Sequence, residues 1–250
     1  MSNSAAVDNP WFRRFKPSDY APARVVFFPH AGGSASYYLE YANALSPYAD
    51  VLAVQYPARQ NRLSEPGIPS VAGLADRLAA ELRPWADRPL YFFGHSMGSA
   101  VAFEVAARFA AEGLSAPEHL FVSAGRAPSL PRATDVHRQG DDALLEEITA
   151  LGGTDRGILA VPALRQVILP SLRADFTAIE TYLCAPGATV PVPITGLVGE
   201  TDPNATVEHV GAWAGHTTGG FDLRVFPGGH FYVAEQVEAV TELIVGRLRG

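Results

Sequence analysis

The chain has 250 residues, of which 48% are hydrophobic and 18% are charged, enough to bury a large core in one globular domain. This composition excludes a disordered or fibrous chain. The formal net charge of -7 disfavours nucleic acids and anionic membranes as partners, because both would repel an acidic chain. No segment has the pattern of a signal peptide or a membrane span, and a single cysteine excludes an internal disulfide. We therefore expect a soluble, cytoplasmic protein.

Short apolar runs alternate along the chain with segments of helical periodicity. Near the N-terminus, Trp11, Phe12 and Phe15 indicate an edge strand. Most of the later runs are continuously apolar, as in strands buried on both faces of a parallel sheet, and the runs are 25–28, 51–54, 90–93, 120–122, 194–198 and 223–226. Helical spacing is found at 71–82, 100–111 and 237–248. This order predicts an open α/β sheet covered by helices, with a ligand site beyond the carboxyl ends of the strands.

The connection that precedes the run at 194–198 is about seventy residues long, much longer than an ordinary loop, so it should contain structure of its own. One helix is expected from Asp142 to Leu151, with a stop signal at Gly152 and Gly153. A second helix should begin at Pro162, be interrupted and kinked near Pro170, and then resume.

This helical insertion leaves the end of a strand and should therefore cover the functional edge of the sheet. We expect a single domain over residues 1–250, with a helical lid insertion at about 129–190. A purely structural subdomain is the alternative.

A Gly-x-Ser-x-Gly motif provides the first candidate catalytic residue. The motif is Gly94-His95-Ser96-Met97-Gly98, and it lies between an apolar run and a helical segment. This is the context of a nucleophile elbow, in which a strained turn presents the serine hydroxyl to the site. We therefore predict Ser96 as a nucleophile, with an ordinary glycine-rich turn as the alternative.

A serine nucleophile needs a base, and the base needs an orienting acid. Asp202 follows one of the late apolar runs, and His230 follows the next. Both should lie at the same sheet edge as Ser96, and the order Ser, Asp, His along the chain is that of an α/β-hydrolase fold. Glu200 is the competing acid, but Asp202 is preferred because it lies clear of the strand and is followed by Pro203.

The remaining histidines and the single cysteine are expected to have no catalytic role. His95 is expected to pack or to hydrogen-bond within the elbow, and Cys184 to be a small buried residue. No pair of histidines has metal-ligand spacing with a carboxylate, so we predict no metal. Solvent exposure is expected for His119, His137, His209 and His216.

An oxyanion hole needs two backbone N–H donors that face the attacked carbonyl. The first should be that of Met97, at the start of the helix after the elbow, where the helix dipole also helps. The second should come from the loop Pro29-His30-Ala31-Gly32-Gly33-Ser34, with Ala31 as the donor and the glycines leaving room for the substrate. A plain glycine turn is the alternative for this loop.

Several motifs together resemble those of type II thioesterases, which accompany modular polyketide and nonribosomal peptide synthases. The resemblance runs from Val25 almost to the C-terminus, with the motifs in order and in register with the elbow. Its one departure is Ala58, where glycine is more usual. The motifs are FPHAGGS at 28–34, YPARQNR at 56–62, GHSMG at 94–98, SAGRAP at 123–128, LRAD at 172–175 and PGGHF at 227–231.

The resemblance implies hydrolysis of acyl thioesters held on the phosphopantetheine arm of an acyl carrier protein, either for editing or for product release. It implies that Ser96 is the nucleophile, that His230 is general base and then acid, and that Asp202 orients the histidine. Met97 and Ala31 are the implied oxyanion donors. Apart from the arm that the substrate carries, no cofactor is implied.

Two further hypotheses concern substrate contacts. Part of the apolar lid surface, including Leu172 and Phe176, should line an acyl channel. Arginines gather in segments that should rim the active site, and the carrier proteins of such systems are generally acidic, so Arg59 and Arg62 are the first candidates for carrier docking. Solvated loop charge is the alternative. The other arginines in these segments are Arg126, Arg132 and Arg138.

Two rival functions share much of this pattern. A general carboxylesterase or lipase acting on small esters would have the same catalytic residues. A catalytically silent hydrolase fold could instead serve as a binding module, although such proteins usually lack a triad member or an oxyanion glycine, and none is missing here. We expect a monomer.

Overall fold

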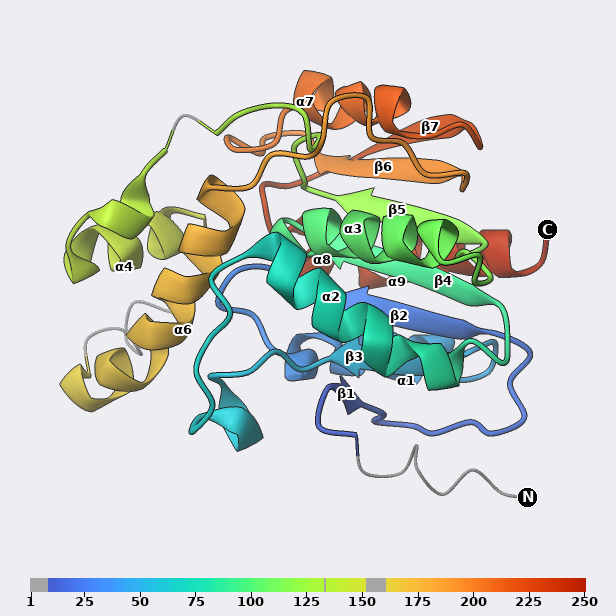
Figure 1. The fold of residues 1–250 in the computed structure, drawn as a ribbon, viewed down its shortest axis with the longest axis horizontal. Coiled ribbons are helices and arrows are strands. Elements are labelled where there is room, and N and C mark those ends of the chain that lie inside the picture. The colour runs from blue at the N-terminus through green and yellow to red at the C-terminus, as the bar shows by residue number, and fades with distance from the viewer. Residues whose placement is uncertain (1–8, 133, 152–160) are drawn as a thin grey trace.

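The computed structural model describes residues 9–132, 134–151 and 161–250 (Figure 1). Its centre is a seven-stranded sheet with the strand order β1-β3-β2-β4-β5-β6-β7. β1 pairs antiparallel with β3, and all other neighbours are parallel. The strands are β1 (Phe12–Arg13), β2 (Arg24–Phe28), β3 (Asp50–Val54), β4 (Leu90–His95), β5 (His119–Ser123), β6 (Ile194–Gly199) and β7 (Phe221–Phe226). The predicted open, mostly parallel α/β sheet and its N-terminal edge strand are confirmed.

Helices cover both faces of this sheet. α2 and α3 pack together on one face, and α1 and α9 pack together on the other, as the front and back layers of Figure 1 show. The helices are α1 (Leu39–Leu45), α2 (Val71–Leu82), α3 (Met97–Ala111), α4 (Asp141–Ala150), α6 (Pro162–Glu180), α7 (Val207–Gly211), α8 (Tyr232–Glu235) and α9 (Val237–Leu248). The start of α2 is fixed by Ser70, whose hydroxyl accepts a hydrogen bond from the backbone N–H of Gly73 at 3.0 Å.

The central strands are apolar throughout because they contribute to two cores. In β2, Val26 and Phe28 point into the core beneath α2 and α3, whereas Val25 and Phe27 point into the core beneath α1 and α9. All four side chains are fully buried, which matches the expected two-sided burial. That expectation is wrong for β7, where Val225 is 52% exposed, because β7 is an edge strand.

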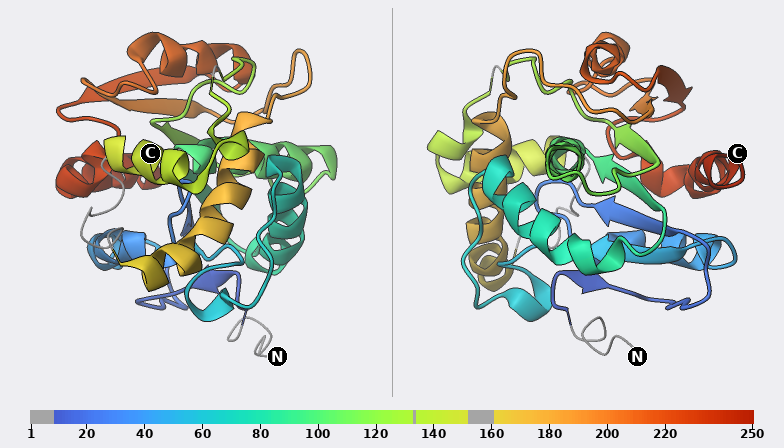
Figure 2. Two further views of the ribbon diagram at one scale, coloured as in Figure 1. Left: turned by 90° about the vertical axis from the view of Figure 1, so that its left-hand side faces the viewer. Right: turned by 45° about the vertical axis from the view of Figure 1, so that its right-hand side comes forward.

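The helices α4 and α6 lie beyond the carboxyl ends of the strands (Figures 1 and 2). They are joined by a small core of their own, which includes Leu144, Leu145, Leu172 and Phe176. The expected interruption near Pro170 is wrong, since α6 is one continuous helix through this residue; the packing of its second half compensates for the hydrogen bond that the proline lacks. The predicted stop signal at residues 152–153 lies outside the described residues.

Among the described residues, no helix has both the length and the apolar character needed to cross a membrane.

Candidate active site

Ser96 lies at the turn between β4 and α3, as the motif predicts. Its φ of 53° is in the left-handed region, a strained conformation for a residue with a side chain and typical of a nucleophile elbow. Gly94 and Gly98 make this turn possible. A Cβ atom on Gly94 would lie 2.3 Å from the carbonyl oxygen of Gly98, and one on Gly98 would lie 1.9 Å from that of Phe28. Neither position therefore accepts a side chain without movement of the backbone.

His230 and Asp202 meet just beyond the carboxyl ends of β7 and β6. The Nδ1 atom of His230 lies 2.8 Å from Oδ2 of Asp202, and both side chains are buried. The other carboxylate oxygen accepts hydrogen bonds from the backbone N–H groups of Asn204 (2.8 Å) and Ala205 (3.1 Å), which hold the acid in place. Because Nδ1 faces the carboxylate, Nε2 is left for proton exchange. The competing Glu200 is exposed to solvent.

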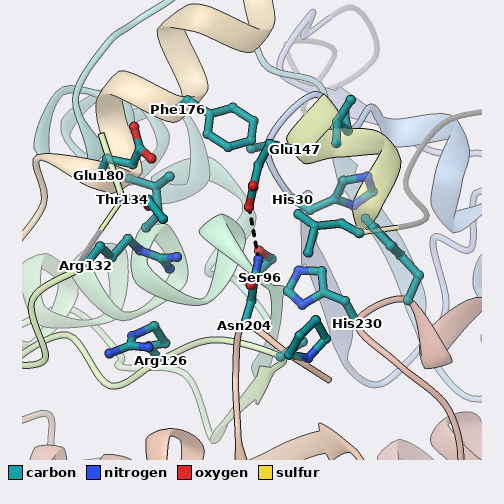
Figure 3. Close-up of a pocket in the computed structure, with 17 residues that line it drawn as sticks. His30, Ser96, Arg126, Arg132, Thr134, Glu147, Phe176, Glu180, Asn204 and His230 are labelled. Carbon is teal, nitrogen blue, oxygen red and sulfur yellow. Dashed lines mark hydrogen bonds between the residues drawn. The ribbon is translucent and has the colours of Figure 1, made fainter. Parts of the chain in front are cut away.

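One cavity of about 140 Å³ brings the predicted nucleophile and base together (Figure 3). Ser96, His230 and Ala31 all line it, on the side of the sheet edge. The opposite wall comes largely from α4 and α6, where Figure 3 shows Glu147 and Phe176 facing the serine. The residues that a hydrolase needs are thus within reach of one small ligand.

Of the two predicted oxyanion donors, Ala31 lines this cavity. Met97 directly follows Ser96 as the first residue of α3, where backbone N–H groups have no acceptor within the helix. The N–H groups of Ala31 and Met97 form no hydrogen bond within the described part of the chain. Both donors therefore remain free for a ligand oxygen.

The side chain of Arg59 links two segments, namely the loop that carries Ala31 and the helix α6. Its guanidinium forms two hydrogen bonds with the carboxylate of Asp175, at 2.8 and 2.9 Å, and Nη1 also donates to the carbonyl oxygen of Gly33 at 2.9 Å. Asp175 in turn accepts a hydrogen bond from the backbone N–H of Gly32 at 2.7 Å. This buried network fixes the loop against α6. Neither the role of Asp175 nor its link to Arg59 was predicted from the sequence, where the motif at 172–175 is the only signal of this residue.

The hypothesis that Arg59 and Arg62 meet a carrier protein at an open rim is contradicted by their burial. They are only 6% and 4% exposed, and Arg62 pairs with Glu65 at 2.6 Å while lying over the ring of Trp11. Both guanidinium groups form ion pairs within the same chain. Ala58 has a φ of 68°, a conformation that glycine adopts without strain. The backbone next to Arg59 is therefore strained at this alanine.

Phe176 and Leu172, the two residues predicted to line an acyl channel, have different positions in the structure. Phe176 lines the cavity together with Ile148 and Ile179. Leu172 is buried in the small core shared by α4 and α6, where it packs so tightly against the loop that a Cβ atom on Gly32 would lie 2.5 Å from it. Leu172 therefore supports the wall of the cavity from behind.

The other predicted structural residues are placed as follows. His95 is fully buried and hydrogen-bonds Ser123 through Nδ1 at 2.9 Å, and Cys184 is buried and free, both as expected. The expected exposure of the remaining histidines is wrong because each is at least partly buried and hydrogen-bonded. Their partners are Thr195 for His119, Glu180 for His137, Thr206 and Arg126 for His209, and Ser129 and Ala188 for His216.

Comparison with known proteins agrees with this geometry. Residues 23–248 match the family model described as "Thioesterase domain". The chain is 45% identical to "Thioesterase PikA5" of Streptomyces venezuelae over 90% of its own length and 81% of that protein. It is 44% identical to the "Probable cadicidin biosynthesis thioesterase" of Streptomyces griseus, over 95% of this chain but only 66% of that relative.

Solved structures show the same relationship. The type II thioesterase BorB from the borrelidin biosynthetic cluster superimposes with a TM-score of 0.86, at 40% identity and with 97% of each chain covered. The resemblance that the sequence motifs indicate is therefore confirmed over nearly the whole chain. This protein belongs to the thioesterase domain family, a family of hydrolases with the α/β-hydrolase fold.

Proposed function

We propose that this protein hydrolyses acyl thioesters held on the phosphopantetheine arm of an acyl carrier protein. The observation that carries the proposal is the cavity where Ser96, on its strained elbow, shares a wall with His230, whose Nδ1 is bonded to Asp202. The relatives named as thioesterases of antibiotic clusters support a thioester as the bond that is cleaved. In this proposal the chain edits or releases intermediates of polyketide or nonribosomal peptide synthesis.

The first step transfers the acyl group to the enzyme. Nε2 of His230 takes the hydroxyl proton of Ser96 while Oγ attacks the thioester carbonyl carbon. The negative charge on the carbonyl oxygen is stabilised by the N–H groups of Ala31 and Met97. The carbon–sulfur bond then breaks, and the sulfur of the arm leaves as a thiol with the proton from His230, which returns the imidazole to its neutral form. Asp202 keeps the imidazole in the required tautomer throughout.

The second step releases the acid. A water molecule gives a proton to Nε2 of His230 and attacks the acyl-serine carbonyl, with the same two N–H donors stabilising the oxyanion. The ester bond to Ser96 breaks, and the serine oxygen recovers its proton from His230. α4 and α6 act as the lid that encloses the acyl group during both steps. No cofactor enters this sequence beyond the arm of the substrate.

The test compares carrier-bound and free substrates. A carrier protein loaded with acetyl, hexanoyl or decanoyl groups is incubated with the wild type, with Ser96→Ala and with Ser36→Ala, and the carrier mass is followed by mass spectrometry. Ser36 is an exposed serine and serves as the matched control. Loss of the acyl mass with the wild type and Ser36→Ala, but not with Ser96→Ala, is expected. Cleavage of a nitrophenyl ester without cleavage of any carrier-bound acyl group would favour an esterase instead.

A further inference from the structure

Two arginines line the same cavity as the nucleophile. Arg126 and Arg132 follow β5, and both face the cavity with Ser96 and His230; Figure 3 shows them on the wall beside the serine. They also line an adjoining space of about 10 Å³ next to Ser96, which is too small for an acyl chain. An acyl group in the main cavity, bound at Ser96, meets the two guanidinium groups.

The hydrogen-bonding capacity of these arginines is largely unused. Arg126 reaches Nδ1 of His209 at 3.2 Å and the carbonyl oxygen of Pro131 at 3.4 Å, and its buried Nε has no partner. Arg132 forms neither a hydrogen bond nor an ion pair with any residue that the structure describes. Burial, together with the neighbouring charge of Arg126, lowers the pKa of Arg132 to about 10. A buried donor without a partner, such as Nε of Arg126, is costly, and the partly buried Arg132 adds further donors on the same cavity wall. This placement points to a ligand.

Two glutamates on the same cavity leave these donors free. Glu180 accepts hydrogen bonds from the backbone N–H groups of Val136 (3.1 Å) and His137 (2.8 Å) and contacts the imidazole of His137 at 2.6 Å. Glu147 accepts one from the side chain of Asn204 at 3.3 Å. Two carboxylates balance the formal charge of two guanidinium groups, so the cavity offers no excess positive charge to an anion. It offers unpaired donors, which suit neutral acceptor oxygens.

We propose that Arg126 and Arg132 form a subsite for keto or hydroxyl oxygens on the acyl chain, close to the thioester. The protein would then prefer oxygenated, polyketide-like acyl groups to saturated fatty acyl groups of the same length. This inference rests on the proposed thioesterase function. The size of the cavity, about 140 Å³, places the recognised oxygen within a few carbons of the bond that is cleaved. A site built around hydrogen-bond donors discriminates strongly against a ligand that leaves them unpaired.

The test uses N-acetylcysteamine thioesters, which carry no phosphate. Butyryl and 3-oxobutyryl thioesters have the same chain length and differ by one keto oxygen. Arg132→Met removes the donors and keeps an apolar side chain, and Arg138→Met is the matched control at an exposed arginine that lies outside the cavity lining. The quantity to compare is the ratio of kcat/KM between variant and wild type for each substrate, which cancels the different intrinsic reactivities of the two thioesters.

Arg132→Met is expected to lower kcat/KM about 10- to 100-fold for the 3-oxobutyryl thioester, to leave the butyryl thioester within about threefold, and to be partly rescued by Arg132→Lys. Arg138→Met should change neither. An equal loss on both substrates would overturn the proposal, as would a loss confined to phosphopantetheine-bound substrates, which would indicate a phosphate contact. A larger loss for a succinyl thioester than for 3-oxobutyryl would overturn it in favour of an anion site.

The inference and the proposed function fail in different ways. If the wild type cleaves neither thioester, on carrier or on N-acetylcysteamine, the thioesterase function itself is wrong. If the wild type cleaves the butyryl thioester and Arg132→Met leaves the ratio between the two substrates unchanged, only the oxygen subsite is wrong.

Discussion

The contribution of Asp202 to catalysis can be tested without disturbing the fold. Its carboxylate contacts Nδ1 of His230 and two backbone N–H groups, so Asp202→Asn keeps the shape but presents an amide that favours the wrong tautomer of the imidazole. We expect kcat for an acyl thioester to fall about 1,000- to 10,000-fold, with the far-UV circular dichroism unchanged. Asp222→Asn, at a partly exposed aspartate of β7, is the control. A fall of less than tenfold would mean that another acid orients His230.

His30 makes the stability of the protein sensitive to acid. Its ring is buried beside Phe231 and His95, and burial, with smaller contributions from His230 and Arg59, lowers the pKa of His30 from 6.5 to about 3. Between these values the unfolded chain binds a proton that the folded chain excludes. The free energy of unfolding is therefore highest above the unfolded pKa and declines as the pH falls below it.

For His30 alone, this loss between about pH 7.5 and about pH 5 is about 2 kcal/mol. In His30→Gln the loss should be smaller by that amount, because the titrating group is gone. Urea unfolding of both proteins at the two pH values measures the difference. The contributions of the other buried histidines are present in both proteins and cancel. If the free energy of unfolding fell equally in wild type and variant, His30 would bind its proton as readily in the folded protein as in the unfolded chain.

At the scale of elements, α6 does more than cover the cavity, because Asp175 on this helix bonds Arg59 and the N–H of Gly32 in the loop that carries Ala31. Asp175→Asn should lower the free energy of unfolding by about 3 to 5 kcal/mol, since it leaves the Arg59 charge buried without its partner. It should also lower kcat more than it changes KM, because the Ala31 donor loses its support.

A more exposed ion pair between α6 and α4 supplies the control for this prediction. Arg173 on α6 pairs with Asp141 on α4 at 2.6 Å, and the two side chains are 36% and 59% exposed. Asp141→Asn should change the unfolding free energy by less than about 1 kcal/mol. Chemical denaturation and steady-state kinetics of the two variants give both quantities. Similar effects of the two substitutions would contradict a special role of the buried pair.

The elements that could be predicted from sequence are those with a local signal. The continuous apolar run of β2 and the capping serine before α2 follow from neighbouring residues, and so do the two glycines that flank Ser96. The pairing of Arg59 with Asp175 spans 116 positions and leaves no mark in either segment. For the same reason the partners of His119, His137 and His216 were not predictable, since they lie at least 28 positions away. Pro170 shows the opposite failure, because a strong local signal is overridden by tertiary packing.

At the scale of the whole molecule, the topology gathers the site. Parallel strands all end at one edge, so the loops after β2, β4, β6 and β7 bring Ala31, Ser96, Asp202 and His230 together although they lie far apart along the chain. The insertion between β5 and β6 supplies the opposite wall. The solved type II thioesterase BorB matches over 97% of each chain, so the similarity includes both the sheet edge and the opposite wall.

The net charge of the whole chain should affect how readily it associates with an acidic carrier protein. The chain carries a formal charge of -7, and the charges of Arg59 and Arg62 are neutralised in internal pairs. An acidic carrier is therefore repelled at long range, and salt shortens the range of that repulsion from roughly 30 Å at 0.01 M to roughly 8 Å at 0.15 M.

Raising sodium chloride from about 20 to about 300 mM should increase kcat/KM for a carrier-bound acyl group by about two- to fivefold. The same acyl group on uncharged N-acetylcysteamine should show no such increase, which separates the encounter from the chemistry. A decrease with salt, seen only for the carrier-bound substrate, would reveal a local basic surface that outweighs the net charge.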